Sequence, residues 1–491
     1  MSFFFPFHHF TLIQIGKVWW FLVICSLASN VFAQKVVVSK EINVKNNYAY
    51  DIFPDIKGNI LFYHDRGQEH VLEIYDQNLT FQNSSEINFP DKNVDIISVE
   101  KADSMLNVFF YRKDPPFHHL EKLSVDQNGR QIDTILPVFT LESLIPPKFR
   151  HVTSEDGSKL AVFWVENKYF NYIIVNNDKE CAILDAGKIE NKNFNFKTDF
   201  MGIMLTNRGK IFLLGQKARS WNKLSEESFM LLVIENQEYN LKYLRAQNYI
   251  ISQLKMKYDE KNNQLCFAGL LNKNVEDAAI GYFIYQFTGQ ETDVELLVNE
   301  QLFSLEFIGE VYGKKTTKIK KINDIYIENM ILRADGGALL VLEIKKELLR
   351  RAGSGGISRF GDVYTGRGYI DYYNEDIILI ALHADGTEFW KKILYKKQFS
   401  QDDNAMYSSC FLFITPTRLK FVYNDEIKSN NTVSEYIIDP LGNVKRKSVL
   451  NTQYQNLKLR FKDAIQTSEN TMIVPSEYIN KVNLVRIEYP K

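Results

Sequence analysis

Short apolar runs separated by turn residues recur along almost the whole chain. Runs such as GNILFYH (58–64), HVLEIYD (70–76) and KLAVFWV (159–165) are rich in β-branched and aromatic residues. Side chains of this kind fit a pleated sheet surface. Gly, Asn or Asp follows most of the runs, and these residues favour tight turns. The pattern therefore predicts an all-β protein built from hairpins.

The predicted turns form two interleaved series. The inner series is Lys57-Gly58, Ala102-Asp103, Asp156-Gly157, Arg208-Gly209, Lys261-Asn262, Asp335-Gly336, Thr415-Pro416 and Glu469-Asn470. Its successive steps are 45, 54, 52, 53, 74, 80 and 54 residues. The outer series lies near Asn78, Asn128-Gly129, Asn177-Asp178, Asn236, Gly289, Asp385-Gly386 and Leu441-Gly442. Four strands for each step of about 50 residues are typical of a β-propeller blade.

The two ends of the chain predict how the ring closes. Beyond residue 456 the pattern gives only three strands, in 459–467, 471–476 and 482–489, whereas KVVVSKEINV (35–44) has no partner nearby. Pairing this N-terminal strand with the C-terminal blade removes an open sheet edge. We therefore expect eight blades, with seven as the near alternative. Two β-sandwich domains are a further alternative, because strand patterns alone do not separate these folds.

The first segment has the pattern of a secretory signal peptide. Lys17 precedes an apolar run, and Val31 and Ala33 place small side chains before a cleavage position ahead of Gln34. We expect residues 1–33 to be removed, so that 34–491 forms a single propeller domain. The expected location is the periplasm, the outer-membrane surface or the extracellular medium.

Two inserted segments interrupt the period. Residues 300–321 contain a stretch with helical apolar spacing, followed by a basic run that we interpret as a solvated link. Residues 350–374 are rich in Gly, Arg and Tyr, and long loops of this kind are often functional. Arginine forks bind anions, and tyrosine faces suit sugars and proteins. With a nearby tryptophan, the candidate ligand-binding residues are Arg359, Tyr364, Arg367, Tyr369, Tyr372, Tyr373 and Trp390.

Composition and motifs favour binding over catalysis. Lys and Arg total 59 against 60 Asp and Glu, so there is no basic surplus for nucleic acid. The chain contains neither G-x-S-x-G nor H-E-x-x-H, and it predicts no catalytic residues, metal site or cofactor. His64 and His70 flank a turn but lack enough companions for a metal site. Its three cysteines after residue 33 are expected to be free and buried.

An enzymatic alternative rests on carboxylates around the second insertion. Glycoside cleavage uses a pair of carboxyl groups, and Glu328, Glu343, Asp371 and Asp376 are the candidates. Sequence gives no distance between them. Whether the protein is an enzyme is therefore left open, with a non-catalytic role favoured.

Residues 326–424 carry a resemblance to known sequences. The matching positions are Ile327-Glu328-Asn329, Asp335-Gly336-Gly337, Tyr372 to Ile377, Asp385-Gly386 with Trp390, Lys397-Gln398 and Tyr423-Asn424-Asp425. This stretch resembles secreted proteins of Bacteroidota-type bacteria, which are predicted propellers of uncharacterised function. It covers about a fifth of the chain and implies a location more than an activity.

These observations predict a secreted, non-catalytic propeller that serves as a binding or scaffold module at the cell envelope. The expected partner is a protein or a glycan, and no membrane-spanning segment is expected after residue 33. A carbohydrate-active or other hydrolytic enzyme is the alternative, and a purely structural envelope component is a third possibility.

Overall fold

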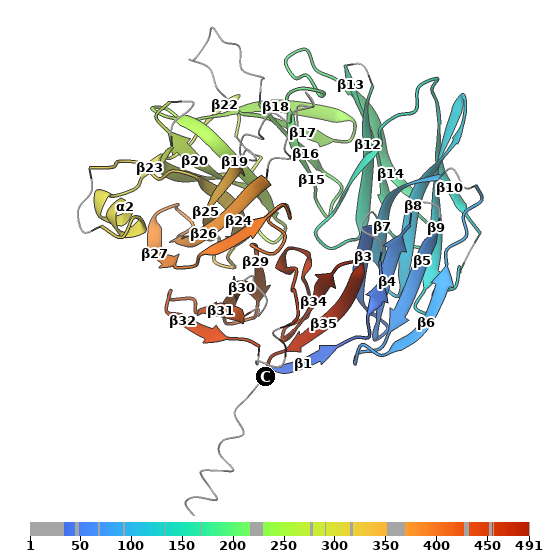
Figure 1. Cartoon of the computed structure of the whole chain (residues 1–491). Helices are drawn as coiled ribbons and strands as arrows, with labels where there is room; N and C mark the ends of the chain where they lie inside the picture. Colours follow the sequence, from blue (N-terminus) through green and yellow to red (C-terminus); the bar gives the residue numbers. More distant parts are fainter. Residues whose placement is uncertain are drawn as a thin grey trace, which may run out of the picture.

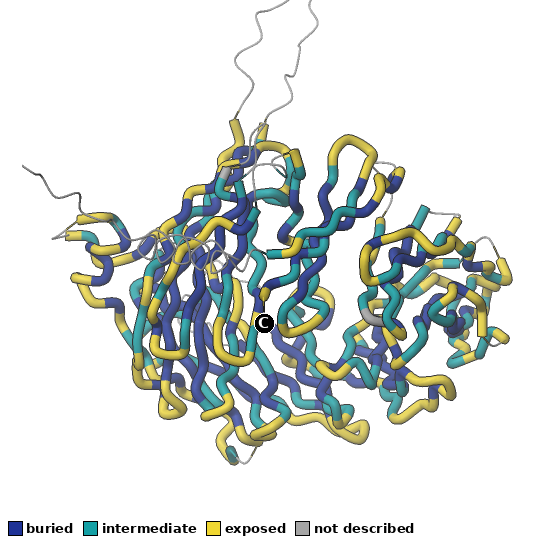
Figure 2. Tube along the Cα trace, turned by 90° about the horizontal axis from the view of Figure 1, so that it is seen from below, coloured by how far each residue is buried: buried dark blue, intermediate teal, exposed yellow. Residues whose placement is uncertain are grey.

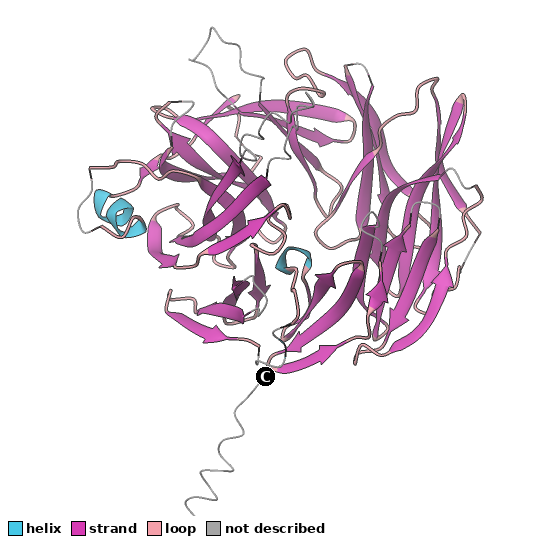
Figure 3. Cartoon of the chain, viewed as in Figure 1, coloured by secondary structure: helices cyan, strands magenta, loops and turns pink. Residues whose placement is uncertain are grey.

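A computed structural model shows a ring of eight β-sheets arranged around a common axis in sequence order (Figure 1). The structure describes residues 34–44, 49–66, 69–91, 94–132, 134–166, 168–216, 229–274, 278–289, 291–314, 318–350, 369–426, 432–450, 454 and 456–490. Strands make up nearly all of its regular structure (Figure 3). The protein is an eight-bladed β-propeller, as the turn series predicts.

The first four blades follow the chain from β3 to β18. Blade one contains β3 (Ala49–Ile56), β4 (Asn59–Asp65), β5 (His70–Tyr75) and β6 (Phe81–Glu86). Blade two contains β7 (Val94–Ala102), β8 (Met105–Asp114), β9 (Phe117–Asp126) and β10 (Leu136–Glu142). Blade three contains β11 (Arg150–Thr153), β12 (Lys159–Glu166), β13 (Tyr169–Asn176) and β14 (Ile183–Glu190). Blade four contains β15 (Phe200–Leu205), β16 (Ile211–Gln216), β17 (Phe229–Glu235), β18 (Glu238–Arg245) and the later β22 (Glu295–Leu297), which pairs with β18 in parallel.

The remaining blades complete the ring. Blade five contains β19 (Ile250–Asp259), β20 (Gln264–Asn272), β21 (Ala279–Phe287) and β23 (Gln301–Leu302). Blade six contains β24 (Ile325–Leu332), β25 (Ala338–Arg350), β26 (Tyr369–Leu382), β27 (Glu388–Leu394) and β28 (Gln398–Gln401). Blade seven contains β29 (Cys410–Ile414), β30 (Leu419–Glu426), β31 (Thr432–Ile438) and β32 (Val444–Ser448). Blade eight contains β33 (Ile465–Ser468), β34 (Thr471–Tyr478) and β35 (Lys481–Glu488), together with β1 (Lys35–Val38) and β2 (Ile42–Asn43).

The N-terminal strand closes the ring as predicted. β1 and β2 both pair antiparallel with β35, the last strand of the chain. The blue β1 and the dark red β35 lie side by side in Figure 1. Without β1 and β2, this side of β35 would be an open row of backbone donors and acceptors.

Apolar clusters fill the seams between neighbouring blades. In β25, Leu340 and Leu342 face blade five, whereas Leu339 and Val341 face blade seven. Alternate side chains of a strand point to opposite faces of its sheet. A middle strand of a blade therefore needs apolar residues at successive positions, and this explains the apolar runs in the sequence. Figure 2 shows that buried residues follow the strands and that exposed residues gather at the connections.

The cysteines stay unpaired within the described chain. Cys181, Cys266 and Cys410 are all free, as expected, and the first two are buried. Cys410 differs from the expectation because it is partly exposed, at the start of an inner strand of blade seven. The predicted signal peptide lies outside the described residues. None of the helices in the described part of the chain is long and apolar enough to cross a membrane.

Candidate functional site: a polar cleft between blades five and six

The link between blades five and six is longer than most links in the ring. It runs from Phe303 to Asp324 and contains helix α2 (Leu305–Val311). The Ser304 hydroxyl caps this helix by accepting a hydrogen bond of 3.2 Å from the Phe307 amide. Phe307 and Ile308 are buried in the seam between the two blades. The helical spacing predicted within 300–321 is thus confirmed, although Gln301 and Leu302 form the edge strand of blade five.

Hydrogen bonds fix residues 322–324 at the end of the link. Ile322 exchanges two backbone hydrogen bonds with Ala279 of blade five, of 2.8 and 3.1 Å. The Tyr312 hydroxyl, at the end of α2, accepts a 3.0 Å hydrogen bond from the Asn323 amide. The Asp324 carbonyl accepts a 2.8 Å hydrogen bond from the Lys345 amide of blade six. Residues 322–324 are therefore held to both blades and form a fixed wall.

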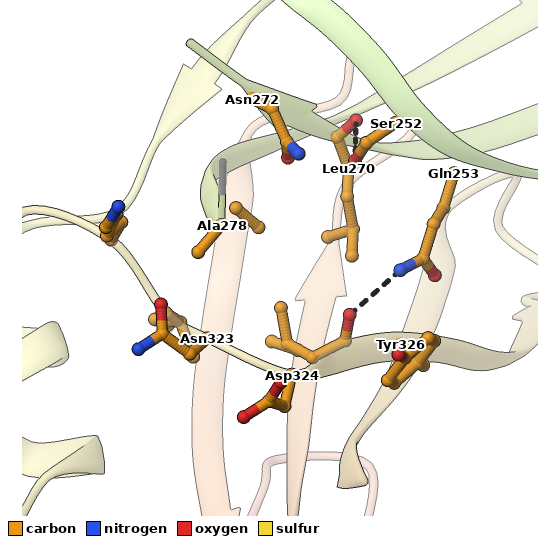
Figure 4. Close-up of a pocket in the computed structure, with 12 residues that line it drawn as sticks. Ser252, Gln253, Leu270, Asn272, Ala278, Asn323, Asp324 and Tyr326 are labelled. Carbon is orange, nitrogen blue, oxygen red and sulfur yellow. Dashed lines mark hydrogen bonds between the residues drawn. The ribbon is translucent and has the colours of Figure 1, made fainter. Parts of the chain in front are cut away.

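This wall encloses a polar cleft of about 390 Å³ (Figure 4). Its lining residues are Ser252, Gln253, Leu270, Asn272, Ala278, Ala279, Lys321, Ile322, Asn323, Asp324, Ile325 and Tyr326. The Gln253 amide spans the seam, because it donates to the Ile325 carbonyl at 2.9 Å and accepts from the Ile327 amide at 3.0 Å. Ser252 donates to the Leu270 carbonyl at 3.3 Å. Strands from both blades thus present polar side chains to one space.

The cleft combines an aromatic ring with polar groups of several kinds. Tyr326 is 45% exposed, and Asn323 and Asp324 beside it are also exposed. Figure 4 shows these residues along the lower edge of the cleft, with Asn272 across from them. Asp324 is the one carboxylate among the described lining residues, whereas glycoside cleavage normally needs two. The arrangement is suited to hold a polar ligand.

The sequence did not single out this cleft. Ser252, Gln253, Asn272, Asn323, Asp324 and Tyr326 come from three segments, and none of them belongs to a recognisable motif. The only signal was the lengthened step across 262–336, which marked where an insertion alters the ring. It did not indicate which side chains the insertion brings together.

The predicted Gly/Arg/Tyr-rich loop is shorter than expected at both ends. β25 extends to Arg350, and β26 begins at Tyr369, so the predicted loop positions 369–374 belong to a strand. A strand continues here because β26 pairs on one side with β25 and on the other with β28. Arg359, Tyr364 and Arg367 lie outside the described residues.

The three described tyrosines lie on β26 but do not share one surface. Tyr369 is exposed, and Tyr373 contacts the ring of Phe399 with centroids 5.1 Å apart. Tyr372 is buried, and its hydroxyl donates to the Asn404 side chain at 3.1 Å. Residues separated by an odd number of positions point to opposite faces of a strand. Tyr372 therefore faces away from the other two.

Trp390 lies elsewhere in blade six. It packs in the seam with blade seven and donates from its indole nitrogen to the Pro440 carbonyl at 3.1 Å. Gly442 is in the left-handed region, with φ of 81°, and a Cβ there would lie 2.7 Å from the Trp390 ring. The turn of blade seven thus depends on glycine to approach this tryptophan. The structure does not bring Trp390 together with the tyrosines of β26.

Two of the candidate catalytic carboxylates, Glu328 and Glu343, form ion pairs with lysines. Glu343 is buried and lies 2.5 Å from the Nζ of buried Lys396 and 3.1 Å from that of Lys345. Glu328 contacts the same Lys345 at 2.8 Å. Burial opposes the charge of Lys345, but these two carboxylates outweigh it and hold its pKa above its usual value. The group joins the middle of blade six to the connection between β27 and β28.

Asp371 and Asp376 are held in other ways. Asp371 is fully buried, is paired with Arg350 and accepts a 2.8 Å hydrogen bond from Gln401. Asp376 accepts a hydrogen bond of 3.0 Å from the Lys396 amide. Burial raises the pKa of Asp376, although that hydrogen bond opposes the change. None of these four carboxylates is among the residues that line the cleft.

The two histidines that flank the turn between β4 and β5 are packed in blade one. Both His64 and His70 are buried, and His70 Nδ1 lies 2.8 Å from the Tyr63 hydroxyl. Within the described residues, no group of three His, Cys, Asp or Glu side chains is close enough to hold a metal ion. His118 and His119 lie at the start of β9 and, as adjacent residues of a strand, point to opposite faces of it.

Acid is expected to destabilise the propeller through His64. Burial, with a smaller effect of Arg66, lowers its pKa from 6.5 to about 4, although the Glu73 carboxylate lies 3.5 Å away. Between pH 6.5 and about pH 4 this histidine binds a proton in the unfolded chain but not in the folded protein. The free energy of unfolding therefore falls as the pH falls through this window. The loss should reach about 2–3 kcal/mol. Urea unfolding near pH 7 and near pH 4 gives the free energy of unfolding at the two ends of the window, and the difference measures this loss.

Two variants check the assignment. His64→Phe removes the titrating group, so its loss of stability on acidification should be smaller than that of the parent protein. His151→Gln replaces a histidine that is 40% exposed and should leave the loss unchanged. An equal loss in the parent and in His64→Phe would contradict the prediction.

Comparison with known proteins supplies no family. No family model matches the chain, and no curated protein matches it. Among solved structures, the Dos1 propeller is 11% identical, with a TM-score of 0.43 over 92% of this chain and 95% of that one. The β-propeller domain of Nup133 from Vanderwaltozyma polyspora is 11% identical, with a TM-score of 0.34 over 80% and 100%. A protein of unknown function from Bacteroides caccae is also 11% identical, with a TM-score of 0.26 over 67% and 94%.

The propeller assignment therefore rests on the eight sheets and their closure. The similarities give this chain no activity or ligand. The resemblance to secreted Bacteroidota-type proteins stays a prediction.

Proposed function

We propose that this protein is a secreted, non-catalytic propeller that binds a glycan in the cleft between blades five and six. The observation that carries the proposal is the exposed Tyr326 ring beside amide, hydroxyl and carboxylate groups held by both blades. A sugar presents hydroxyl groups that both donate and accept hydrogen bonds. Asn, Gln, Ser and Asp side chains match these hydroxyls, and an aromatic face covers the C–H face of the ring.

The lining of the cleft favours a glycan over a protein segment. A protein interface usually places apolar anchors at its centre. Here the buried apolar residues Leu270, Ile322 and Ile325 belong to the seam, and polar side chains project from the walls. Hydrogen bonds already fix Gln253 and the backbone of Asn323 and Asp324. A ligand would therefore meet a site that needs little ordering.

The cell envelope is the proposed location. The support is the predicted signal peptide in 1–33 and the resemblance over 326–424. Cleavage before Gln34 would leave β1 intact, because that strand begins at Lys35. The protein would then act in the periplasm, at the outer-membrane surface or outside the cell.

Glycan binding should depend on Tyr326. Thermal shift of the purified protein against polysaccharide and cell-wall fragments identifies a ligand, since binding to the folded state raises the melting temperature. Titration then gives the affinity of each variant. Tyr326→Ala should weaken binding about ten-fold or more, because it removes the stacking surface. Asp324→Asn should have a smaller effect, since an amide oxygen still accepts a hydrogen bond.

Tyr478→Ala is the matched control, because Tyr478 is 56% exposed on blade eight, far from the cleft along the ring. It should bind as the parent protein does. If Tyr326→Ala and Tyr478→Ala bind equally well, the cleft is not the site. If the bound glycan is cleaved and Glu328→Gln stops the cleavage, the protein is an enzyme and the proposal fails.

A further inference from the structure

A second groove lies between blades two and three, outside the glycan cleft. It has a volume of about 690 Å³. The link from Ser143 to Phe149 forms one wall, the end of β12 forms the other, and the link that precedes β15 contributes Phe196 and Lys197. Phe163, Trp164 and Phe196 give this groove an aromatic lining, in contrast to the polar cleft.

Two apolar side chains stand exposed beside the groove. Leu144 is 88% exposed and Ile145 is 78% exposed, more than any other large apolar residue in the described chain. Burying such a side chain fully is worth about 1.5–3 kcal/mol. Adjacent, strongly exposed apolar residues at the edge of a hollow are typical of an interaction surface.

The link holds these side chains in place. The Ser143 amide donates to the Pro116 carbonyl at 2.8 Å, and the Ser143 hydroxyl donates to the Ile145 carbonyl at 2.9 Å. Pro146 and Pro147 follow, and a residue before proline is restricted to extended conformations. A segment fixed in this way loses little conformational entropy on binding.

The groove is positively charged. Lys148, Arg150 and Lys197 line it, and Glu166 is its one carboxylate. None of the three cations forms an ion pair with a residue in the described ranges, and Arg150 lies over the Phe200 ring at 5.7 Å. Unpaired cations around an apolar hollow select a partner that is both apolar and acidic.

We propose that this groove docks an extended segment of a partner protein, in which a large apolar side chain is flanked by acidic residues. The apolar side chain enters between the link and β12, and the acidic residues face the three cations. A protein segment fits better than a lipid surface, because the groove is concave and can enclose one side chain. The site is separate from the glycan cleft, so either proposal can fail without the other.

Labelled hexapeptides test the proposal by fluorescence polarisation with the full chain. Four acidic peptides of the form Ac-Glu-Asp-X-X-Glu-Asp carry Phe, Leu, Ile or Trp at X, and their Lys counterparts are the charge controls. At least one acidic peptide should bind, and its Lys counterpart should not. Binding should weaken as NaCl rises from about 50 to about 500 mM, because salt screens exposed charges.

Variants locate the binding. Leu144→Ser with Ile145→Ser, and Lys148→Glu with Arg150→Glu, should each weaken binding about ten-fold or more. All four residues are exposed, so the propeller should remain folded, and thermal melts check this. Leu441→Ser changes a leucine that is 70% exposed on a turn of blade seven and should have no effect.

Four results would overturn the proposal. In the first, none of the acidic peptides binds, and in the second, acidic and Lys peptides bind equally well. In the third, both double variants bind the peptide as the parent protein does. In the fourth, phosphatidylglycerol vesicles release the bound peptide. The last result would show that the groove contacts lipid.

Discussion

Removal of residues 34–44 is expected to abolish cooperative folding of the propeller. This segment supplies β1 and β2, whose backbones pair with β35, and it buries Ile42 and Val44 between blades eight and one. The Ser39 amide also donates to the Leu484 carbonyl at 2.9 Å. Loss of the segment 34–44 exposes the apolar seam between blades eight and one and leaves an open edge on β35. The cost, above about 5 kcal/mol, approaches the whole stability of a typical domain.

Comparison of 45–491 with 34–491 tests this expectation. The longer chain should melt cooperatively as a monomer, whereas the shorter one should aggregate or lose its sharp transition. A synthetic peptide of residues 34–44 should restore part of the transition, because it binds only the folded state. Equal melting of the two chains would show that the closing strand contributes little.

Lys396→Met is expected to lower the free energy of unfolding by about 3–5 kcal/mol, since it leaves a buried carboxylate with less compensation. The Lys396 ammonium contacts Glu343 at 2.5 Å and donates to the Asn374 carbonyl at 3.1 Å and the Gln398 side chain at 2.8 Å. All of these groups are buried between blades six and seven. Urea denaturation measures the loss.

A double variant tests whether the unpaired buried charge, rather than the change of side-chain shape, causes the loss of stability. Glu343→Gln combined with Lys396→Met removes both members of the pair and should recover part of the loss, because no buried charge then lacks its partner. Lys397→Met is the control. The Lys397 side chain is next to Lys396 in sequence but is exposed, so its loss should change the free energy of unfolding little. If Lys396→Met and Lys397→Met have equal effects, the ion pair is not a determinant of stability.

The fold was accessible from sequence because its signals are local. Each blade repeats apolar runs that end at residues suited to left-handed turns, such as Gly58, Gly157 and Gly336. A run whose alternate residues meet two different neighbouring blades must be apolar at successive positions. The unpartnered strand at 35–44 and the three-strand ending then indicated an eighth blade.

The sites were less accessible, because they depend on segments distant in sequence. Ser252 and Tyr326 line one cleft although 74 positions separate them, and a fixed link brings them together. Trp390 and Tyr372 looked like neighbours of one loop, but strand alternation and the seam with blade seven turn them to different surroundings. Residues 351–368, which contain three of the predicted ligand-binding residues, lie outside the described structure.

By itself, the sequence determined most of the strands and their turns, because hydrophobic period and turn chemistry act over a few residues. It favoured the eight-blade ring and its closure over seven blades or two β-sandwiches. Only the tertiary structure decided which polar side chains share a cleft, which carboxylates pair with lysines, and which apolar residues remain exposed. Those features follow from the packing of blades against one another, and side chains from different blades meet only when the ring has closed.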